Sequence, residues 1–393
     1  MKTVLFAWER GGGFGHTATL AQFARVLRRH QIRPVFVLRQ PETARLLDAG
    51  VQVLQAPPWP SDAADRSDAP RSTATMHDQL VSAGLADEHG LRNLLQAWDG
   101  ILTTTAPDLV VADYAPAASL MARGRIPLIV AGNGFTAPPD DMKRFPLLHR
   151  VTPPRWREDE TLQIVNRVLQ SLKRPALEYL PQIFAGDAQT VLTFPVLDPY
   201  DMQRSEPLAG PVLDSAPRES RKNATDVFVY LSQGVLGRLP FDLVPVLLPL
   251  ASRLIISAPD MLREQAEDLA RRGARISSQH LPLGETLASS CLVIHFGGGG
   301  LAAHAVAAGV PQLILATHIE QLLNGLQLEK AGLGKVIDSF DPQIDVAHAL
   351  TQILSNDDLR RRASQAGQVH RDMLKTMKPL DTFEAAALKL LGL

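Results

Sequence analysis

The stretch VIHFGGGGLAAHAVAAGVPQLILATHIEQLLNGLQLEKAGLG, residues 293–334, contains four consecutive glycines between a short apolar run and a helix-like pattern. The apolar run predicts a buried strand, and the alanine-rich segment after the glycines predicts a helix. A glycine-rich turn at a helix start leaves backbone N–H groups unpaired beside the positive end of the helix dipole. Phosphate or diphosphate is the natural ligand of such a turn. The alternative is that the glycines only let the turn pack closely against the helix.

The same order of strand and helix recurs through the N-terminal half. Short runs rich in Val, Leu and Ile are typical of strands that are buried on both faces. They predict strands at residues 3–8, 33–38, 51–56, 108–113 and 126–132. Helical patterns lie between them, at residues 16–30, 41–50, 76–104 and 115–124. The alternation predicts an α/β fold with a parallel sheet and helices on both faces.

A segment rich in Pro, Asp and Ser, residues 206–222, interrupts this pattern and is predicted to be a linker. After it, strands are expected at residues 226–232, 253–258, 274–278, 291–296, 312–316 and 335–338. Helices are expected between them, including residues 240–250, 260–272 and 319–331. We therefore expect two doubly wound, Rossmann-like domains, residues 1–205 and 223–378, facing a ligand-binding cleft. Residues 379–393 are expected to form a terminal helix that packs back on the N-terminal domain.

Composition excludes several classes of protein. The net charge of −1 gives no support to wholesale nucleic-acid binding. The only cysteine, Cys291, leaves no internal disulfide and fits a reducing, cytoplasmic setting. No apolar run approaches the length of a membrane span, and the N-terminus does not resemble a signal peptide. The chain has no D-x-D, H-E-x-x-H or C-x-x-C motif, so we expect no metal at its active site.

A second glycine loop, GGGFGH at residues 11–16, precedes the first predicted helix. His16 lies where the loop becomes helix, and the positive end of the helix dipole favours a neutral imidazole that can accept a proton. The alternative is that His16 only starts the helix. The glycine spacing is not G-x-G-x-x-G, and Arg39 ends the second strand where an NAD site would have an acidic residue. Both observations weigh against a dehydrogenase, although an arginine at this position could suit the 2′-phosphate of NADP.

Several motifs together resemble those of two-domain, nucleotide-sugar-dependent glycosyltransferases of family 1. GFGHTATLAQFARVL is similar to their N-terminal G-G-H-x-x-P helix. Their C-terminal donor signature is matched at Gly297, Gly298, Gly300, Gly309, Val310, Pro311, Glu320, Gln321 and Asn324. LQLEKAGLGKVID also resembles the peptidoglycan N-acetylglucosaminyltransferase. The resemblance spans nearly the whole chain and implies the GT-B fold.

The chain departs from the family pattern at the donor signature. Phe296 stands where the family has its phosphate-binding histidine, and His295 comes one residue earlier, pointing the other way on a strand. His304 stands where the family often has a Glu that touches the ribose. These changes fit an unusual nucleotide, a different anchoring geometry or lost catalysis.

The resemblance implies an inverting transfer from a UDP- or dTDP-linked sugar to a small-molecule or glycan acceptor. His16 would be the general base, and Asp113 at the end of a strand would orient it; the alternative for Asp113 is a helix cap. Glu320 and Gln321 would bind the donor sugar, although they also suit an ordinary solvated helix start. The full set of predicted donor-binding residues is Gly13, Gly15, Ser232, Gly234, His295, Phe296, Gly297, Gly298, Gly299, Gly300, His304, Glu320 and Gln321.

The acceptor is the least defined part of the prediction. In this fold, variable loops of the N-terminal domain shape the acceptor pocket, here residues 57–75 and 133–160. Their large apolar residues are Trp59, Met76, Phe135, Met142, Phe145 and Trp156. Residues 142–157 carry five Lys and Arg side chains, which suit an anionic acceptor, a membrane surface or simply a solvated loop.

Two other functions stay open at this point. One is an isomerase or hydrolase of nucleotide sugars on the same fold, which would need more acid–base groups than His16 and Asp113. The other is a non-catalytic protein that binds a nucleotide sugar, which Phe296 and His304 would explain.

Overall fold

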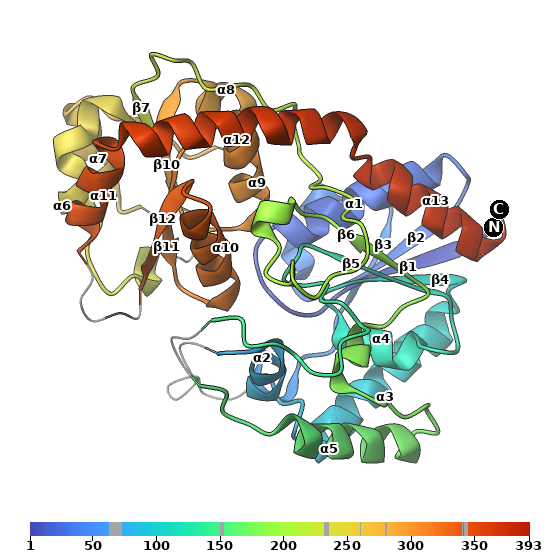
Figure 1. The fold of residues 1–393 in the computed structure, drawn as a ribbon. Helices are drawn as coiled ribbons and strands as arrows, with labels where there is room; N and C mark the ends of the chain where they lie inside the picture. Colours follow the sequence, from blue (N-terminus) through green and yellow to red (C-terminus); the bar gives the residue numbers. More distant parts are fainter. Residues whose placement is uncertain are drawn as a thin grey trace. The chain divides into compact units, whose positions relative to one another are not determined.

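The computed structural model describes residues 1–62, 73–149, 153–231, 236–259, 261–279, 281–339, 341 and 345–393. The chain forms two compact units. Unit 1 comprises Met1–Leu192, Tyr200–Gly210 and Lys378–Leu393, and unit 2 comprises Thr193–Pro199 and Pro211–Met377. Figure 1 shows the strands and helices of each. The predicted positions Ser232 and Gly234 lie outside the described residues.

Unit 1 is built on a six-stranded parallel sheet of order β3-β2-β1-β4-β5-β6. Its strands are β1 (Thr3–Trp8), β2 (Arg33–Leu38), β3 (Gln52–Gln55), β4 (Leu109–Asp113), β5 (Leu128–Gly132) and β6 (Ala188–Val191). The central strands β1 and β4 are buried along their whole length, as continuous apolar runs predict. Residues Trp8 and Asp113 pair where the two strands end together.

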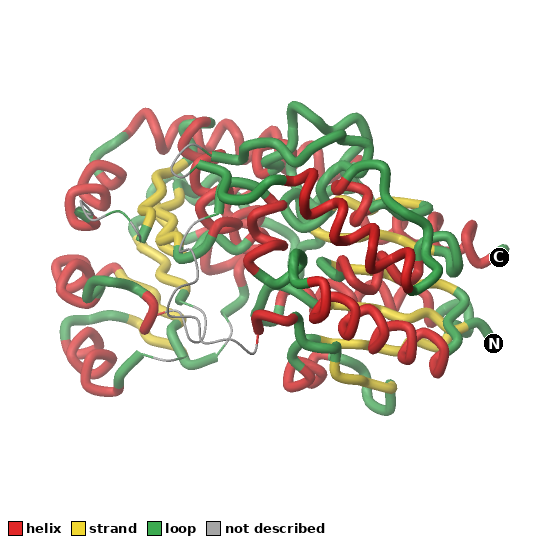
Figure 2. Tube along the Cα trace, turned by 90° about the horizontal axis from the view of Figure 1, so that it is seen from below, coloured by secondary structure: helices red, strands yellow, loops and turns green. Residues whose placement is uncertain are grey.

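The helices of unit 1 enclose this sheet, as the red and yellow segments of Figure 2 illustrate. They are α1 (Gly15–Arg28), α2 (Met76–Ser82), α3 (Glu88–Thr105), α4 (Pro116–Ala122), α5 (Glu158–Ser171) and α13 (Pro379–Leu391). The 3-10 segments among the described residues of unit 1 are η1 (Pro41–Leu46), η2 (Pro60–Asp62) and η4 (Leu180–Phe184). The segment expected as a helix at 41–50 is thus a shorter 3-10 turn.

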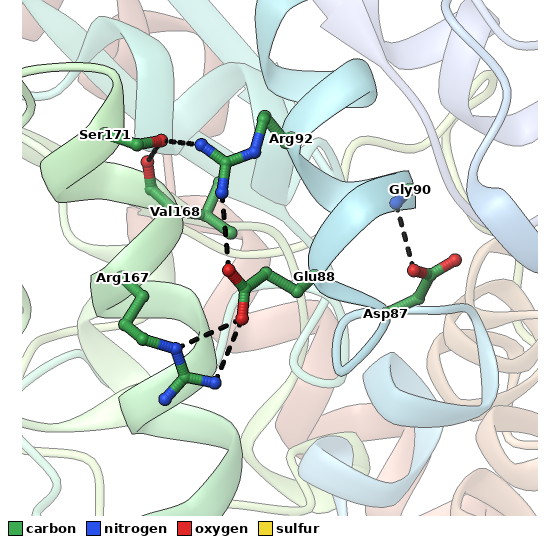
Figure 3. A network of polar contacts seen from close by, with 7 residues as sticks. All are labelled: Asp87, Glu88, Gly90, Arg92, Arg167, Val168 and Ser171. Carbon is green, nitrogen blue, oxygen red and sulfur yellow. Dashed lines mark hydrogen bonds and ion pairs between the residues drawn. The ribbon is translucent and has the colours of Figure 1, made fainter.

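Helix α5 and strand β6 are elements that the sequence pattern did not reveal. Helix α5 begins with three acidic residues, which suit the positive end of its dipole. Figure 3 shows how it is tied to α3: the Glu88 carboxylate accepts hydrogen bonds from Arg167 Nε at 3.1 Å and Nη2 at 3.0 Å, and from Arg92 Nη2 at 3.3 Å. These side chains are exposed in large part, so the network contributes little to stability.

The C-terminal helix α13 packs on α1 within unit 1. The rings of Phe23 and Phe383 stack with centroids 3.8 Å apart, and both are fully buried. At the end of α1, His30 Nε2 lies 2.8 Å from the Glu384 carboxylate.

Unit 2 has its own six-stranded parallel sheet, of order β12-β11-β10-β7-β8-β9. The strands are β7 (Asp226–Tyr230), β8 (Leu254–Ser257), β9 (Arg275–Ser277), β10 (Ser290–His295), β11 (Gln312–Ala316) and β12 (Gly334–Asp338). The helices are α6 (Val244–Leu247), α7 (Arg263–Arg271), α8 (Leu283–Ala288), α9 (Gly299–Ala308), α10 (Ile319–Lys330), α11 (Val346–Leu354) and α12 (Asp357–Thr376). Among the described residues, unit 2 also has the 3-10 segments η5 (Pro195–Leu197), η6 (Leu236–Arg238) and η7 (Leu248–Arg253).

The helix expected at 240–250 is broken in the structure. Its residues form the four-residue helix α6 followed by η7. Proline explains the break, because Pro249 has no N–H to donate to the carbonyl four residues earlier and its ring crowds that carbonyl. Across the described ranges, no helix is both long and apolar enough to cross a membrane.

Candidate functional site

His16 and Asp113 meet where two neighbouring strands of unit 1 end. Asp113 is the last residue of β4, and His16 is the second residue of α1, shortly after β1. The His16 Nδ1 atom lies 3.0 Å from Asp113 Oδ1, and the two side chains are 13% and 4% exposed. The indole ring of Trp8, at the end of β1, stacks on the imidazole with centroids 5.0 Å apart. The imidazole is therefore held by a carboxylate on one edge and by an aromatic ring on one face.

The other nitrogen of His16 faces Gly11. A Cβ atom on Gly11 would lie 2.7 Å from His16 Nε2, and Gly11 has φ +83°, so this position needs a glycine for both space and conformation. A carboxylate beside Nδ1 favours the tautomer in which Nε2 can accept a proton. The pair has the arrangement of a general base and the group that orients it. Sequence reasoning named His16 and Asp113 but missed Trp8 and Gly11.

Gly13 and Gly15 border the same loop. The N–H of Gly13 donates to Gln40 Oε1 at 3.1 Å, and Gly15 is the first residue of α1. Both glycines are exposed. The predicted role of these two positions in donor binding stays a prediction.

In unit 2, the four glycines form the turn between β10 and α9. Gly297 has φ +79°, Gly298 is the N-cap residue, and α9 begins at Gly299 without a side-chain cap. The first N–H groups of α9 therefore have no partner within the helix. A Cβ on Gly298 or Gly300 would meet no atom within 4 Å, so the backbone is open on that side.

The inner side of the turn is closely packed. A Cβ on Gly297 would lie 2.8 Å from Ile314 Cγ2 and 2.9 Å from the carbonyl oxygen of Gln321. The Asn324 amide Nδ2 donates to the Gly297 carbonyl at 2.7 Å. The turn is thus fixed by β11 and α10 while its outer face stays open, so the glycines serve both close packing and an exposed N–H cradle.

His295 supports the turn from inside the sheet. Its Nδ1 accepts a hydrogen bond from Gly297 N–H at 3.1 Å, and its Nε2 lies 2.9 Å from Gln312 Oε1. One neutral tautomer satisfies both contacts. Burial lowers the pKa of His295 to about 4, so the imidazole stays neutral at physiological pH. Gln312, which opens an otherwise apolar strand, is a further supporting residue that sequence reasoning missed.

The side chains of His295 and Phe296 do not reach the open face of the turn. They are only 1% and 4% exposed, and Phe296 belongs to the hydrophobic core formed with Leu231, Leu313 and Leu315. Successive strand residues point to opposite faces of the sheet, and both faces are buried here. His295 therefore supports the backbone of the turn and Phe296 packs in the core, and neither side chain is placed for the predicted donor contact.

His304 lies on α9, one turn beyond Gly300. The residue is 3% exposed, and its Nε2 lies 2.8 Å from Oδ1 of Asp214, whose side chain is 49% exposed. The buried His304 Nδ1 has no hydrogen-bond partner among the described residues. Burial and the Asp214 carboxylate raise the pKa of Tyr230, at the end of β7. The Asp214 carboxylate, the His304 imidazole and the Tyr230 phenol therefore lie near one another beside α9. Sequence reasoning missed Asp214 because this residue comes from the predicted linker.

Glu320 and Gln321 lie in the first turn of α10. Gln321 is 8% exposed, and its Oε1 accepts from the N–H and the hydroxyl of Thr317 at 2.8 and 3.0 Å. Its carbonyl oxygen also packs against Gly297. Gln321 therefore joins α10 to the loop after β11, and Glu320 is half-buried beside it.

The loops expected to shape an acceptor pocket contribute mainly to the core. Trp59, Met76, Phe135, Met142 and Phe145 are each less than 10% exposed, whereas Trp156 is 37% exposed. A pocket of about 360 Å³ does open beside Trp156, lined by Thr75, His77, Arg144, Phe145, Pro154, Trp156, Arg157, Glu158 and Asp159. Within the part of the chain that is described, no cluster of three or more His, Cys, Asp or Glu side chains is arranged to hold a metal ion.

Sequence comparison relates the chain to enzymes of sugar transfer. Residues 250–386 match a family described as "Erythromycin biosynthesis protein CIII-like, C-terminal domain". The chain is 26% identical over 311 residues to the PGL/p-HBAD biosynthesis rhamnosyltransferase of Mycobacterium bovis (strain BCG / Pasteur 1173P2). That alignment spans 70% of this chain and 66% of the relative, so the chain spans about two thirds of the relative's length.

Solved glycosyltransferases share the fold. CalG4, the calicheamicin glycosyltransferase, matches with a TM-score of 0.68 at 19% identity, over 100% of this chain and 98% of that chain. The spinosyn rhamnosyltransferase SpnG complexed with thymidine diphosphate matches with a TM-score of 0.62 at 19% identity, over 99% and 98%. The two six-stranded parallel sheets thus form the GT-B glycosyltransferase fold, which confirms the fold expected from the sequence.

Proposed function

We propose that this protein is an inverting glycosyltransferase that moves a sugar from a UDP- or dTDP-linked donor to a small-molecule or glycan acceptor. The observation that carries the proposal is the turn before α9, which is fixed from inside while Gly298 and Gly300 border open space. Such a turn suits a diphosphate, because backbone N–H groups and the helix dipole bind it without any side chain. The spinosyn rhamnosyltransferase SpnG, which shares the fold and was solved with thymidine diphosphate, supports this ligand.

The rest of the donor would extend from this turn. Gly300 and His304 are one helical turn apart and so lie on one face of α9. We propose that Asp214, which His304 holds at 2.8 Å, accepts a hydrogen bond from a ribose hydroxyl. Glu320 and Gln321, at the start of α10, are proposed to bind the hydroxyls of the donor sugar.

The proposed chemistry uses the His16–Asp113 pair. Nε2 of His16 takes the proton of the acceptor hydroxyl while the acceptor oxygen bonds to the anomeric carbon of the donor. The bond from that carbon to the diphosphate oxygen breaks, and attack from the opposite side inverts the configuration. The Asp113 carboxylate stabilises the imidazolium that forms, and the N–H groups of the glycine turn take up the charge of the leaving diphosphate.

The acceptor pocket is proposed beside Trp156. The cavity of about 360 Å³ has the size of a small-molecule site and joins an aromatic ring to charged groups. Burial raises the pKa of Glu158 to about 7, which suits a polar acceptor that donates a hydrogen bond. A Trp156→Ala variant is expected to raise KM for the acceptor and leave nucleotide affinity unchanged.

Nucleotide binding is the first test. We would measure thermal unfolding with UDP, dTDP, GDP, CMP and NADP, each alone. A ligand at about 100 times its dissociation constant stabilises a protein by roughly 2.7 kcal/mol. Stabilisation by UDP or dTDP but not by NADP is expected, and Gly298→Ala should weaken it because its methyl group would occupy the open face. A protein that no nucleoside diphosphate stabilises would overturn the proposal.

Transfer is the second test, with His16→Ala compared to His30→Ala at the other end of α1. His16→Ala should keep dTDP affinity and lose roughly 10²–10⁴-fold in kcat. His30→Ala should keep both, since the His30 imidazole lies 2.8 Å from the Glu384 carboxylate of α13 and has no part in the proposed chemistry. Nucleotide binding without turnover for any acceptor would favour the non-catalytic function, and release of free sugar without an acceptor would favour a hydrolase.

A further inference from the structure

Glu9 is a buried carboxylate that the proposed chemistry does not use. It directly follows β1 and is 2% exposed. Its Oε1 accepts a hydrogen bond from Ala118 N–H at 2.6 Å, and its Oε2 accepts from Ala117 N–H at 3.1 Å and from Trp59 Nε1–H at 2.8 Å. Acidic side chains are rarely this buried unless they are paired. All three partners are hydrogen-bond donors, which an ionised carboxylate can satisfy at once.

These contacts join the segments that carry His16 and Asp113. Ala117 and Ala118 lie in the first turn of α4, which begins at Pro116 and is separated from Asp113 by only two residues. In that short connection Tyr114 has φ +45°, and its carbonyl accepts a hydrogen bond from Arg10 N–H at 3.1 Å. On the other side, Glu9 follows Trp8, whose ring stacks on His16. Glu9 is therefore connected to Asp113 through its hydrogen bonds to α4, and to His16 through the neighbouring residue Trp8.

Two arginines lie beside Glu9, and burial opposes its charge. Burial raises the pKa of Glu9 to about 7, against the hydrogen bonds from Ala118, Trp59 and Ala117 and the charge of Arg10, which lower it. The guanidinium of Arg10 lies over the Trp59 ring at 5.3 Å, and Arg39 donates to the Glu9 carbonyl at 3.1 Å. The residues of α4 carry no charged side chain. A protonated Glu9 would turn an acceptor oxygen into a donor that faces other donors.

We propose that Glu9 is a positioning residue for the His16–Asp113 pair, and that its carboxylate must be ionised, as well as His16 neutral, for the pair to hold its working geometry. Protonation of Glu9 would release α4 or Trp59 and so shift Asp113 or Trp8 against the imidazole. The inference rests on the proposed function for its activity measurement and stands on geometry within unit 1 alone.

The first experiment is the pH dependence of kcat/KM for glycosyl transfer. Because two groups must lose a proton, the acid limb for the wild type should approach a slope of about two in log kcat/KM against pH. Glu9→Gln keeps the size of the side chain but cannot ionise, so its slope should fall to about one, with a plateau at least about tenfold lower. Glu9→Asp, which still ionises, should keep the slope of about two.

Asp108→Asn is the matched control. Asp108 also accepts a backbone hydrogen bond in unit 1, from Thr3 N–H at 2.8 Å, but at the opposite end of β1 from Glu9. This variant should keep the steep limb of the wild type. If Glu9→Gln also keeps it, or if the wild type shows a slope of one, the positioning role is overturned. Should Glu9→Gln fail to fold, the acid limb of the wild type still tests the role, because a slope of one overturns it.

The second experiment needs no activity. With ¹⁵N-labelled indoles, the Trp59 Nε1–H resonance should titrate near pH 7 in the wild type and lose this titration in Glu9→Gln. Trp98, which is fully buried in α3, serves as the internal reference. An unchanging Trp59 resonance would overturn the inference. A titrating Trp59 in a protein without transfer activity would overturn the proposed function and leave the link between Glu9 and Trp59 standing.

Discussion

The side chain of Asn324 donates a hydrogen bond of 2.7 Å to the carbonyl oxygen of Gly297, and thereby joins the middle of α10 to the turn before α9. The two residues lie in the same stretch of sequence but on different elements, separated by strand β11. Asn324 is 5% exposed, so its amide has little access to water. The contact fixes the backbone from inside at the point where its outer face is open.

Asn324→Asp should destabilise unit 2 and weaken nucleotide binding. The change replaces the donor Nδ2 by an oxygen that faces the Gly297 carbonyl, and a buried group left without its hydrogen bond costs about 1–3 kcal/mol. Thermal unfolding and the affinity for dTDP measure the two effects. Asn93→Asp is the control, because Asn93 is exposed on α3 and should change neither quantity. Equal behaviour of the two variants would mean that the Asn324 contact does not hold the turn.

Gly297→Ala and Gly298→Ala should differ in stability although the residues are neighbours. At Gly297 a methyl group would lie 2.8 Å from Ile314 and 2.9 Å from Gln321, with φ +79°. The conformation alone costs of order 1–3 kcal/mol. At Gly298 no atom lies within 4 Å of the added methyl group and φ is −61°, so stability should be kept while diphosphate affinity falls. A Gly297→Ala variant with wild-type unfolding would contradict the packed inner side of the turn.

The sequence was informative where local pattern decides the structure. Continuous apolar runs identified strands such as β1 and β10, because strands buried on both faces need no alternation. The glycines before α9 and His16 at the start of α1 were identified because turns and helix starts have local signals. The short strand β6, with residues AQTV, has no such apolar run, and α5 (Glu158–Ser171) begins at the end of the segment 133–160 that was expected to form a variable loop.

Contacts between distant segments could not be predicted in this way. Asp214 comes from the predicted linker and meets His304 on α9, and nothing in either local pattern selects the other. Glu9 is likewise one acidic residue in a loop until α4 and the Trp59 loop enclose it. The burial of His295 and Phe296 also depends on the sheet as a whole. Both faces of the sheet are covered, so neither side chain lies at the surface.

His295 should make the protein sensitive to acid. Burial lowers its pKa to about 4 in the folded protein, against about 6.5 in the unfolded chain. Between about pH 6.5 and 4, His295 is protonated in the unfolded state but not in the folded state. The folding free energy is therefore unaffected by the titration of His295 above pH 6.5 and becomes less favourable as the pH falls to about 4. The loss amounts to about 3 kcal/mol.

Chemical denaturation of the wild type and His295→Gln from pH 7.5 to 4 checks this value. Other buried groups titrate in the same range, so the quantity of interest is the difference in unfolding free energy between the two proteins. The wild type should lose stability relative to the variant as the pH falls. A difference that does not change with pH would mean that His295 takes up its proton in the folded state as easily as in the unfolded state.

Gly11→Ala should impair catalysis through His16. The added Cβ would lie 2.7 Å from Nε2, closer than real Cβ contacts allow, so either the loop or the imidazole must move. If the ring moves, the distance of 3.0 Å between Nδ1 and Asp113 is lost, and with it the orientation of the proposed base. We expect kcat to fall at least about tenfold while the affinity for dTDP is kept, since misplaced catalytic groups lower the rate steeply.

Because Gly11 also has φ +83°, the strain of the backbone must be separated from the collision with the ring. Gly50→Ala provides this control, because Gly50 has φ +79° in an exposed loop with no atom within 4 Å of the added methyl group. Gly50→Ala should lose a similar amount of stability and keep its full rate. Equal rates for the two variants would show that Gly11 serves the loop conformation alone and that Nε2 does not depend on the space beside it.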